Sequence, residues 1–154
     1  MNNDIQILVD ADACPVKEEI YKVAFRHSVS VKIVANSYLR IPRHAALKLI
    51  VVSDGFDAAD DWIAEHSTQK SVVVTADILL ADRCLKADAT VISPNGKPFT
   101  ADTIGGAIAT RAIMADLRGS GDQVGGGAKP YSKQDRSNFL QALDTALVRL
   151  QRMS

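Results

Sequence analysis

Short apolar runs alternate with amphipathic stretches along most of the chain. The apolar runs predict strands over residues 5–9, 30–35, 47–52, 71–74 and 89–92. Runs of this length, bounded by polar turn residues, are typical of strands that are buried on both faces. The stretches between them carry apolar residues at helical spacing. The alternation therefore predicts an α/β fold with a parallel sheet of about five strands, covered by helices on both faces.

The predicted helices cover residues 15–27, 57 onward, 78–85, 102–117 and 132 onward. The last two follow the final strand, so we expect them to pack on the core as extra C-terminal helices. Between them, residues 118–130 contain five glycines. Such a segment is too rich in glycine for regular structure and predicts a flexible loop.

Size and charge narrow the classes of protein that fit this pattern. A chain of 154 residues suits one domain over residues 1–154. Its 18 basic and 18 acidic side chains give no net charge, which argues against strong non-specific binding to nucleic acid. The two cysteines form no C-x-x-C pattern, so neither a zinc site nor a disulfide framework is indicated.

The sequence also favours a protein of the cytoplasm. Its first residues lack the charged region and apolar core of a signal peptide. No apolar run approaches the roughly 18 residues of a membrane span. We therefore expect a cytoplasmic protein with no membrane partner.

Two acids, Asp10 and Asp12, follow the first predicted strand. Carboxylates at the carboxyl end of a buried parallel strand lie where open α/β sheets bind ligands. Two of them together repel each other unless a cation or a shared proton neutralises them. Asp12 could instead cap the next helix, but a cap needs only one acid. The pair predicts a site for Mg²⁺ or Mn²⁺, whose preferred ligands are carboxylate oxygens and water.

Two further acids lie at the starts of predicted helices. Asp77 follows the fourth strand in Thr75-Ala76-Asp77, and Asp57 opens the acidic stretch Asp57-Ala58-Ala59-Asp60-Asp61. Both have a structural alternative, since Asp is common at helix N-caps and in first turns. At the converging strand ends, Asp77 would face Asp10. The predicted metal ligands are Asp10, Asp12, Asp57 and Asp77, with Asp10, Asp12 and Asp77 as the catalytic set.

Polar and basic residues flank the predicted acidic cleft. Some lie at or after the second strand and others around the start of the last helix: Asn36, Ser37, Arg40, Arg43, Lys129 and Arg136. Such cations are often only solvated. If they border the cleft, they could hold a phosphate backbone while a metal ion acts on it.

Several long blocks of the chain resemble the YaiI/YqxD family of bacterial proteins. They include residues 9–17, 34–37, 55–63, 74–78 and 135–140. The likeness extends over essentially the whole chain. The family has no established function, so this resemblance implies little chemistry by itself.

A more distant resemblance, to PIN-like and NYN nuclease domains, implies more. Those domains carry an Asp after strand one, an acid in a middle helix and Thr/Ser-x-Asp after strand four; Asp10, Asp57 and Asp77 match these places. The resemblance implies a PIN-like α/β fold and a nuclease that uses Mg²⁺ or Mn²⁺ and acts on RNA in preference to DNA, with single-stranded RNA as the expected partner. The neutral net charge departs from this pattern, as does the lack of an obvious RNA-binding stripe.

Two other functions fit the same residues. In a haloacid-dehalogenase-type phosphohydrolase, Asp10 would be the nucleophile and Asp12 the general acid. That class needs a downstream Lys before an acidic pair, and here the pair Asp60-Asp61 precedes any suitably placed Lys. A non-catalytic module would bind a metal or ligand in the cleft without turnover.

Overall fold

The computed structural model describes residues 4–11, 14–53, 57–106 and 131–153. It contains one six-stranded sheet in the order β3-β2-β1-β4-β5-β6. The strands are β1 (Gln6–Asp10), β2 (Ser30–Ala35), β3 (Leu47–Val51), β4 (Ser71–Val74), β5 (Thr90–Ile92) and β6 (Pro98–Phe99). The first five are parallel, and β6 pairs antiparallel with β5. The predicted α/β class and parallel sheet are confirmed.

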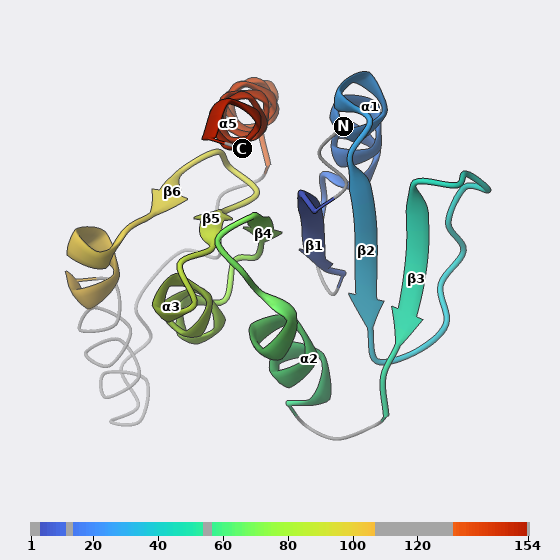
Figure 1. Cartoon of the computed structure of the whole chain (residues 1–154), viewed down its shortest axis with the longest axis horizontal. Coiled ribbons are helices and arrows are strands. Elements are labelled where there is room, and N and C mark those ends of the chain that lie inside the picture. Colours follow the sequence, from blue (N-terminus) through green and yellow to red (C-terminus); the bar gives the residue numbers. More distant parts are fainter. Residues whose placement is uncertain (1–3, 12–13, 54–56, 107–130, 154) are drawn as a thin grey trace.

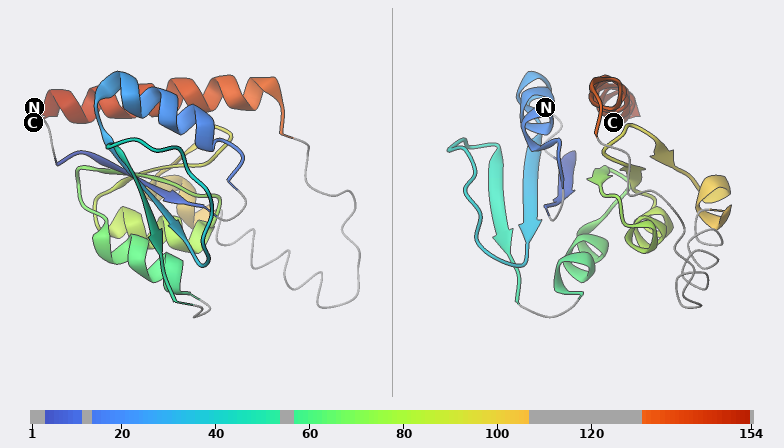
Figure 2. Two further views of the ribbon diagram at one scale, coloured as in Figure 1. Left: turned by 90° about the vertical axis from the view of Figure 1, so that its right-hand side faces the viewer. Right: turned by 180° about the vertical axis from the view of Figure 1, so that it is seen from behind.

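Helices cover both faces of this sheet (Figures 1 and 2). They are α1 (Lys17–His27), α2 (Ala58–His66), α3 (Ile78–Lys86) and α5 (Lys133–Met153), and residues 101–106 are also helical. The two helices α1 and α5 share one face, while α2 and α3 share the other. No helix within the described ranges has the length and apolar character needed to cross a lipid bilayer.

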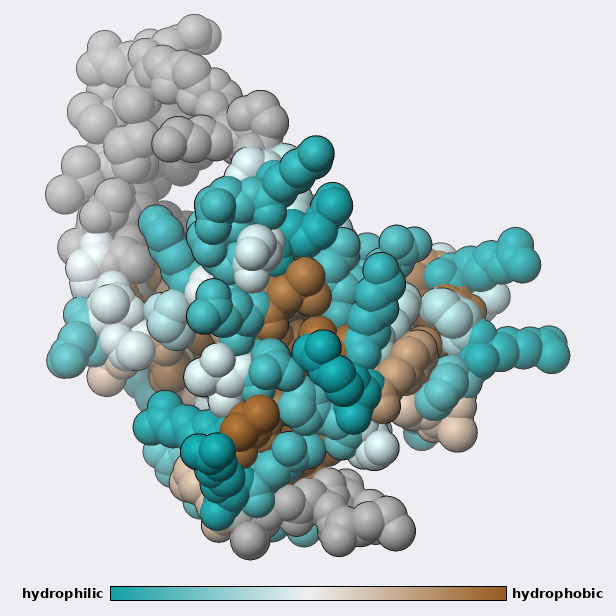
Figure 3. Space-filling model, turned by 90° about the horizontal axis from the view of Figure 1, so that it is seen from above, coloured by the Kyte–Doolittle hydropathy of each residue, from teal (hydrophilic) through white to brown (hydrophobic). Residues whose placement is uncertain are grey.

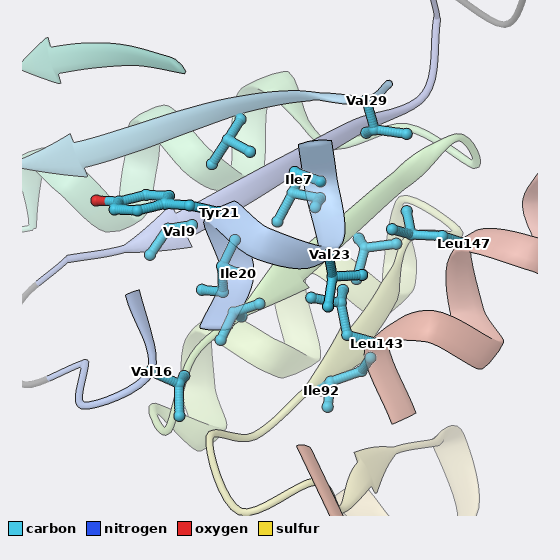
Figure 4. Close-up of a cluster of buried hydrophobic side chains, with 14 of the residues drawn as sticks. Ile7, Val9, Val16, Ile20, Tyr21, Val23, Val29, Ile92, Leu143 and Leu147 are labelled. Carbon is cyan, nitrogen blue, oxygen red and sulfur yellow. The ribbon is translucent and has the colours of Figure 1, made fainter. Parts of the chain in front are cut away.

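Alternation along β1 builds the core. Ile7 and Val9 point into a cluster with α1 and α5, which Figure 4 shows, whereas Leu8 points into a second cluster with α2 and α3. All three are fully buried. A strand covered on both faces reads as a continuous apolar run, which is the pattern that identified it in the sequence.

The layer of α1 and α5 is tied together by polar contacts as well as by the core. His27 of α1 lies 2.6 Å from an Asp144 carboxylate oxygen of α5, and Arg26 lies 3.0 Å from the same oxygen. Seen from above, the outer surface of this layer is largely hydrophilic (Figure 3). Its apolar side chains therefore face the sheet, as expected of amphipathic helices.

The sheet order contains a change of direction. The chain lays down β1, β2 and β3 outward in one direction, then returns and places β4 on the other side of β1. The turns that leave β1 and β4 therefore diverge to opposite sides. In open parallel sheets, such a switch point is where ligands bind, at the carboxyl ends of the strands.

The structure corrects the predicted number of strands. The sheet has six strands rather than about five, because the chain forms a hairpin after β5 and adds the two-residue β6. Two residues are too few to show an alternating pattern, and Pro98 argues against a strand except at a sheet edge.

The predicted strands 30–35 and 71–74 have the observed bounds. The predicted flexible loop, 118–130, and most of the predicted helix 102–117 lie outside the described residues.

Candidate functional site

Asp10 is the last residue of β1 and lies at the switch point, half-buried. The hydroxyl of Thr75, directly after β4, donates a hydrogen bond of 2.9 Å to Asp10 Oδ2. Thr75 is 2% exposed. Because a buried hydroxyl has few alternative partners, this bond fixes the orientation of the Asp10 carboxylate.

The same hydroxyl organises the turn that follows β4. Thr75 Oγ1 accepts the backbone N–H of Asp77 at 3.0 Å. Asp77 then caps α3, since its Oδ1 accepts the N–H groups of Leu79 and Leu80 at 2.9 and 3.3 Å. The capping interpretation of Asp77 is thus correct for one oxygen. A carboxylate has two oxygens, so a cap does not prevent the other from binding a ligand.

Asp10 and Asp77 line one cavity of about 210 Å³. The remaining lining residues are Cys14, Val74, Thr75, Ala76 and Pro94. The sequence predicts that the two acids meet at the sheet edge, and the neighbouring strands β1 and β4 bring them to the same cavity. Asp12 lies outside the described residues.

The three acids at the start of α2 each lie in a different environment. Asp57, just before the helix, is exposed and makes no side-chain cap hydrogen bond. Asp61 is paired with Arg83 at 2.8 Å on the surface. Asp60 is half-buried; burial raises its pKa, and the charges of Asp77 and Asp57 raise it further. Of the acids on α2, Asp60 has a pKa that responds to the charge of Asp77, which lines the cavity.

The sequence contains a signal for Asp60 that the prediction of Asp57 missed. Asp60 is three residues before the buried Ile63 and next to the buried Ala59. Residues three apart share a helix face, so Asp60 points toward the sheet more than Asp57 does. Within the described ranges, no three His, Cys, Asp or Glu side chains are close enough together to hold a metal ion.

Cys14 forms part of the cavity wall. Burial raises the pKa of its thiol, which opposes the thiolate form that nucleophiles and metal ligands need. Its backbone carbonyl accepts a hydrogen bond of 3.2 Å from Lys17 Nζ. Its burial in the core cluster assigns Cys14 a packing role.

Tyr131 connects the last helix to the cavity. Its hydroxyl donates a 2.7 Å hydrogen bond to the carbonyl of Pro94, which lines the cavity. Burial raises the pKa of Tyr131 to about 12, and the negative charge of Glu19 acts in the same direction. The phenol therefore stays protonated at neutral pH and holds the start of α5 against the turn after β5. Sequence reasoning gave no role to Tyr131.

The predicted phosphate-binding residues lie in two parts of the structure, after β2 and near the start of α5. Asn36 is half-buried directly after β2, and Ser37, Arg40 and Arg43 are exposed on the connection to β3. Arg136 pairs with Glu19 of α1 at 3.1 Å, so its charge is already engaged between α1 and α5. Lys129 lies outside the described residues.

Comparison with known proteins identifies close relatives along nearly the whole chain. A family model described as "Uncharacterized BCR, YaiI/YqxD family" matches residues 8–149. A UPF0178 protein from Sphingopyxis alaskensis is 69% identical over 147 residues, covering 95% of both chains. UPF0178 proteins from Brucella ovis and Nitrobacter winogradskyi are 59% and 55% identical over 149 and 148 residues, covering 96% of this chain and 92% and 94% of theirs. No solved structure matches the chain.

Proposed function

The chain belongs to the YaiI/YqxD family, and from the geometry of its switch point we propose that it is a metal-dependent phosphodiesterase that cleaves single-stranded RNA. The observation that carries this proposal is the shared cavity of Asp10 and Asp77, formed where β1 and β4 lie side by side. Open parallel sheets bind ligands at this position.

The donor set fits a hard divalent cation. A nucleotide held directly at such an edge usually lies on a glycine-rich turn, whose N–H groups bind its phosphates. Here the turn after β1 begins Asp10-Ala11-Asp12, which would repel a phosphate in the absence of a cation. Carboxylate oxygens are the preferred protein ligands of Mg²⁺ and Mn²⁺. When bound, either ion activates water and neutralises charge on the leaving oxygen.

Each acid has a role of its own in this proposal. Asp10, oriented by Thr75, and Asp77, anchored at the start of α3, would hold the ion from two neighbouring strands. Asp12 would add the second acid of the first turn. Asp60, rather than Asp57, would add negative charge from α2 near the ion, because its pKa responds to the charge of Asp77; among the described side chains no third ligand lies close enough to complete the site.

The RNA backbone would approach from the side of β2. Asn36 and Ser37 follow β2, which pairs with β1 and ends beside Asp10. Arg40 and Arg43 come next along the chain and are exposed. These groups would steady the phosphate on either side of the bond that is cut, a positioning role that carries no sequence information.

Cleavage of an end-labelled single-stranded RNA in Mn²⁺ tests the proposal. Wild-type protein should cut the RNA, and chelation of the metal with EDTA should stop cleavage. Asp10→Asn should lose the activity, whereas Asp61→Asn should retain it, because Asp61 is paired with Arg83 on the surface. RNA cleavage that survives both EDTA and Asp10→Asn would contradict the proposal. So would a phosphorylated Asp10 trapped from a phosphate ester, which is the mark of the phosphohydrolase alternative.

A further inference from the structure

Two lysines lie side by side on the sheet. Lys32 of β2 and Lys48 of β3 are register partners on parallel strands, which run about 4.8 Å apart. Like charges in such positions destabilise a sheet. In the part of the chain that the structure describes, no carboxylate lies within ion-pair distance of either ammonium. The pair therefore concentrates positive charge between β2 and β3.

The alternation of side chains along each strand determines on which face of the sheet the two lysines lie. Val34 and Ile50 come two residues after Lys32 and Lys48, and both pack into the cluster formed with α2 and α3. The lysines therefore lie on the α2 side of β2 and β3. Lys48 is exposed and Lys32 half-buried.

An aromatic stack lies beside Lys32. The rings of Trp62 and His66 on α2 are stacked, with centroids 3.8 Å apart and planes at 12°. Lys32 Nζ lies 6.0 Å from the centroid of the Trp62 ring. His66 Nδ1 lies 2.7 Å from the Trp62 carbonyl, which can only accept, so this nitrogen carries the proton and the His66 ring is held in place. His66 is exposed, so the face of its ring away from Trp62 can receive another ring.

The same helix connects this surface to the cavity. Asp60, at the start of α2, responds to the charge of Asp77, and His66 ends the helix six residues later. At about 1.5 Å per residue, that separation is roughly 9 Å along the helix axis. The His66 carbonyl accepts a 3.2 Å hydrogen bond from Gln6 Nε2, so the stack lies near the start of β1, whereas Asp10 ends that strand. Four residues of strand span roughly 13 Å at about 3.3 Å per residue, so RNA bound in the cavity must extend along the α2 side of the sheet to reach the stack.

We propose that Lys32, Lys48, Trp62 and His66 form a binding surface for single-stranded RNA, on which the lysines contact phosphates and a base stacks on His66. This inference rests on the proposed function and gives its substrate a second point of attachment. Single strands suit the surface because stacking on a side chain requires an unpaired base. The neutral net charge of the chain is compatible with it, because Lys32 and Lys48 concentrate positive charge locally.

Binding is measured by fluorescence anisotropy with a short labelled polyadenylate in EDTA, where a metal-dependent enzyme cannot cut it. K32Q/K48Q should weaken binding at least tenfold and reduce the slope of log affinity against log salt by about 1.4. H66A should weaken binding at least about fivefold and leave the salt slope unchanged. The matched control is K22Q/K97Q, which removes the same charge from exposed sites on α1 and before β6.

A stability measurement separates loss of binding from loss of fold. K32Q/K48Q should melt at the same temperature as the wild type or higher, because a like-charge pair is removed. Equal RNA affinity of K32Q/K48Q and K22Q/K97Q would contradict the proposed RNA-binding surface. So would competition by polyglutamate as strong as that by polyadenylate, which would assign the surface to an acidic protein partner.

The outcomes also separate this inference from the proposed function. Lysine-dependent binding without cleavage in Mn²⁺ would support the surface and contradict the nuclease. Cleavage with the same KM in wild type and K32Q/K48Q would support the nuclease and overturn the surface.

Discussion

At the scale of single residues, the site depends on Thr75. One buried hydroxyl donates to Asp10 and accepts from the backbone of Asp77, so it couples the carboxylate of β1 to the turn after β4. Groups of this kind orient metal ligands without contacting the ion, and their loss typically lowers metal affinity about 10- to 100-fold.

We predict that Thr75→Val lowers Mn²⁺ affinity by about tenfold or more, because the Asp10 carboxylate loses its orienting bond. The variant should also lose about 1–3 kcal/mol of folding free energy, the usual cost of removing a hydrogen bond to a charged group. Thr75→Ser keeps the hydroxyl and serves as the control. The measurements are metal titration and urea unfolding; a Val variant that binds Mn²⁺ as tightly as the Ser variant would refute the role of Thr75.

Asp60 gives a second prediction, on pH dependence. Burial and neighbouring acids raise the pKa of Asp60, so its ionised form destabilises the metal-free fold. The free energy of unfolding therefore falls as pH rises from the ordinary Asp pKa through the raised pKa of Asp60. Asp60→Asn should therefore stabilise the metal-free protein at pH 7, by less than about 1 kcal/mol because the group is only half-buried.

The melting temperatures of wild type and Asp60→Asn should converge at a pH below the ordinary Asp value of about 3.9, where both side chains are neutral. Saturating Mn²⁺ should reverse their order at pH 7, because the variant lacks a negative charge near the bound ion. An Asp60→Asn protein that is less stable than wild type at pH 7 without metal would contradict this account.

The sequence was sufficient to place Asp10 and Asp77, because both directly follow strongly apolar strands. It was insufficient to choose between Asp57 and Asp60. That choice depends on how α2 is rotated against the sheet, which Ala59 and Ile63 determine by their burial. Acidic residues in a first helical turn are favoured by the helix dipole whatever direction they face, so composition alone could not separate them.

At the scale of elements, the turn after β5 forms one wall of the cavity and packs on α5. Gly96 in this turn has φ +89°, and a Cβ atom there would lie 2.5 Å from the backbone carbon of Asn138. Only glycine combines this conformation with such a close approach. The turn thereby holds Pro94 at the cavity and gives Tyr131 its hydrogen-bond acceptor.

We predict that Gly96→Ala destabilises the protein by about 2–6 kcal/mol, the sum expected from backbone strain and overpacking. Gly105→Ala is the matched control: a Cβ there meets nothing within 4 Å, and the residue is helical, so Ala should be neutral or slightly stabilising. Urea unfolding measures both, and equal stability of the two variants would show that the turn does not pack on α5 as described.

The elements themselves were largely predictable, and the exceptions have clear causes. Strands β2 and β4 are compact runs rich in β-branched residues, and their bounds match the prediction. Strand β6 was missed because its pairing with β5 is decided by the hairpin rather than by its two residues. The contact of Gly96 with α5 joins residues far apart in sequence, and no local pattern encodes it.

At the scale of the whole molecule, the order β3-β2-β1-β4-β5-β6 determines where the chemistry can occur. The switch point between β1 and β4 brings together acids 67 residues apart in sequence, from Asp10 to Asp77. An unfolded chain cannot assemble such a site. A cation that binds it therefore stabilises the folded state by mass action.

The thermal unfolding of wild type and Asp10→Asn, each with and without millimolar Mn²⁺, tests the central claim most directly. Ligand at about 100 times its Kd adds about 2.7 kcal/mol to the stability of the folded state. We expect Mn²⁺ to raise the melting temperature of the wild type by several degrees, as a stabilisation of that size does in a domain of this length. It should raise that of Asp10→Asn much less. A wild-type melting temperature that does not respond to Mn²⁺ would contradict the metal site and, with it, the proposed nuclease.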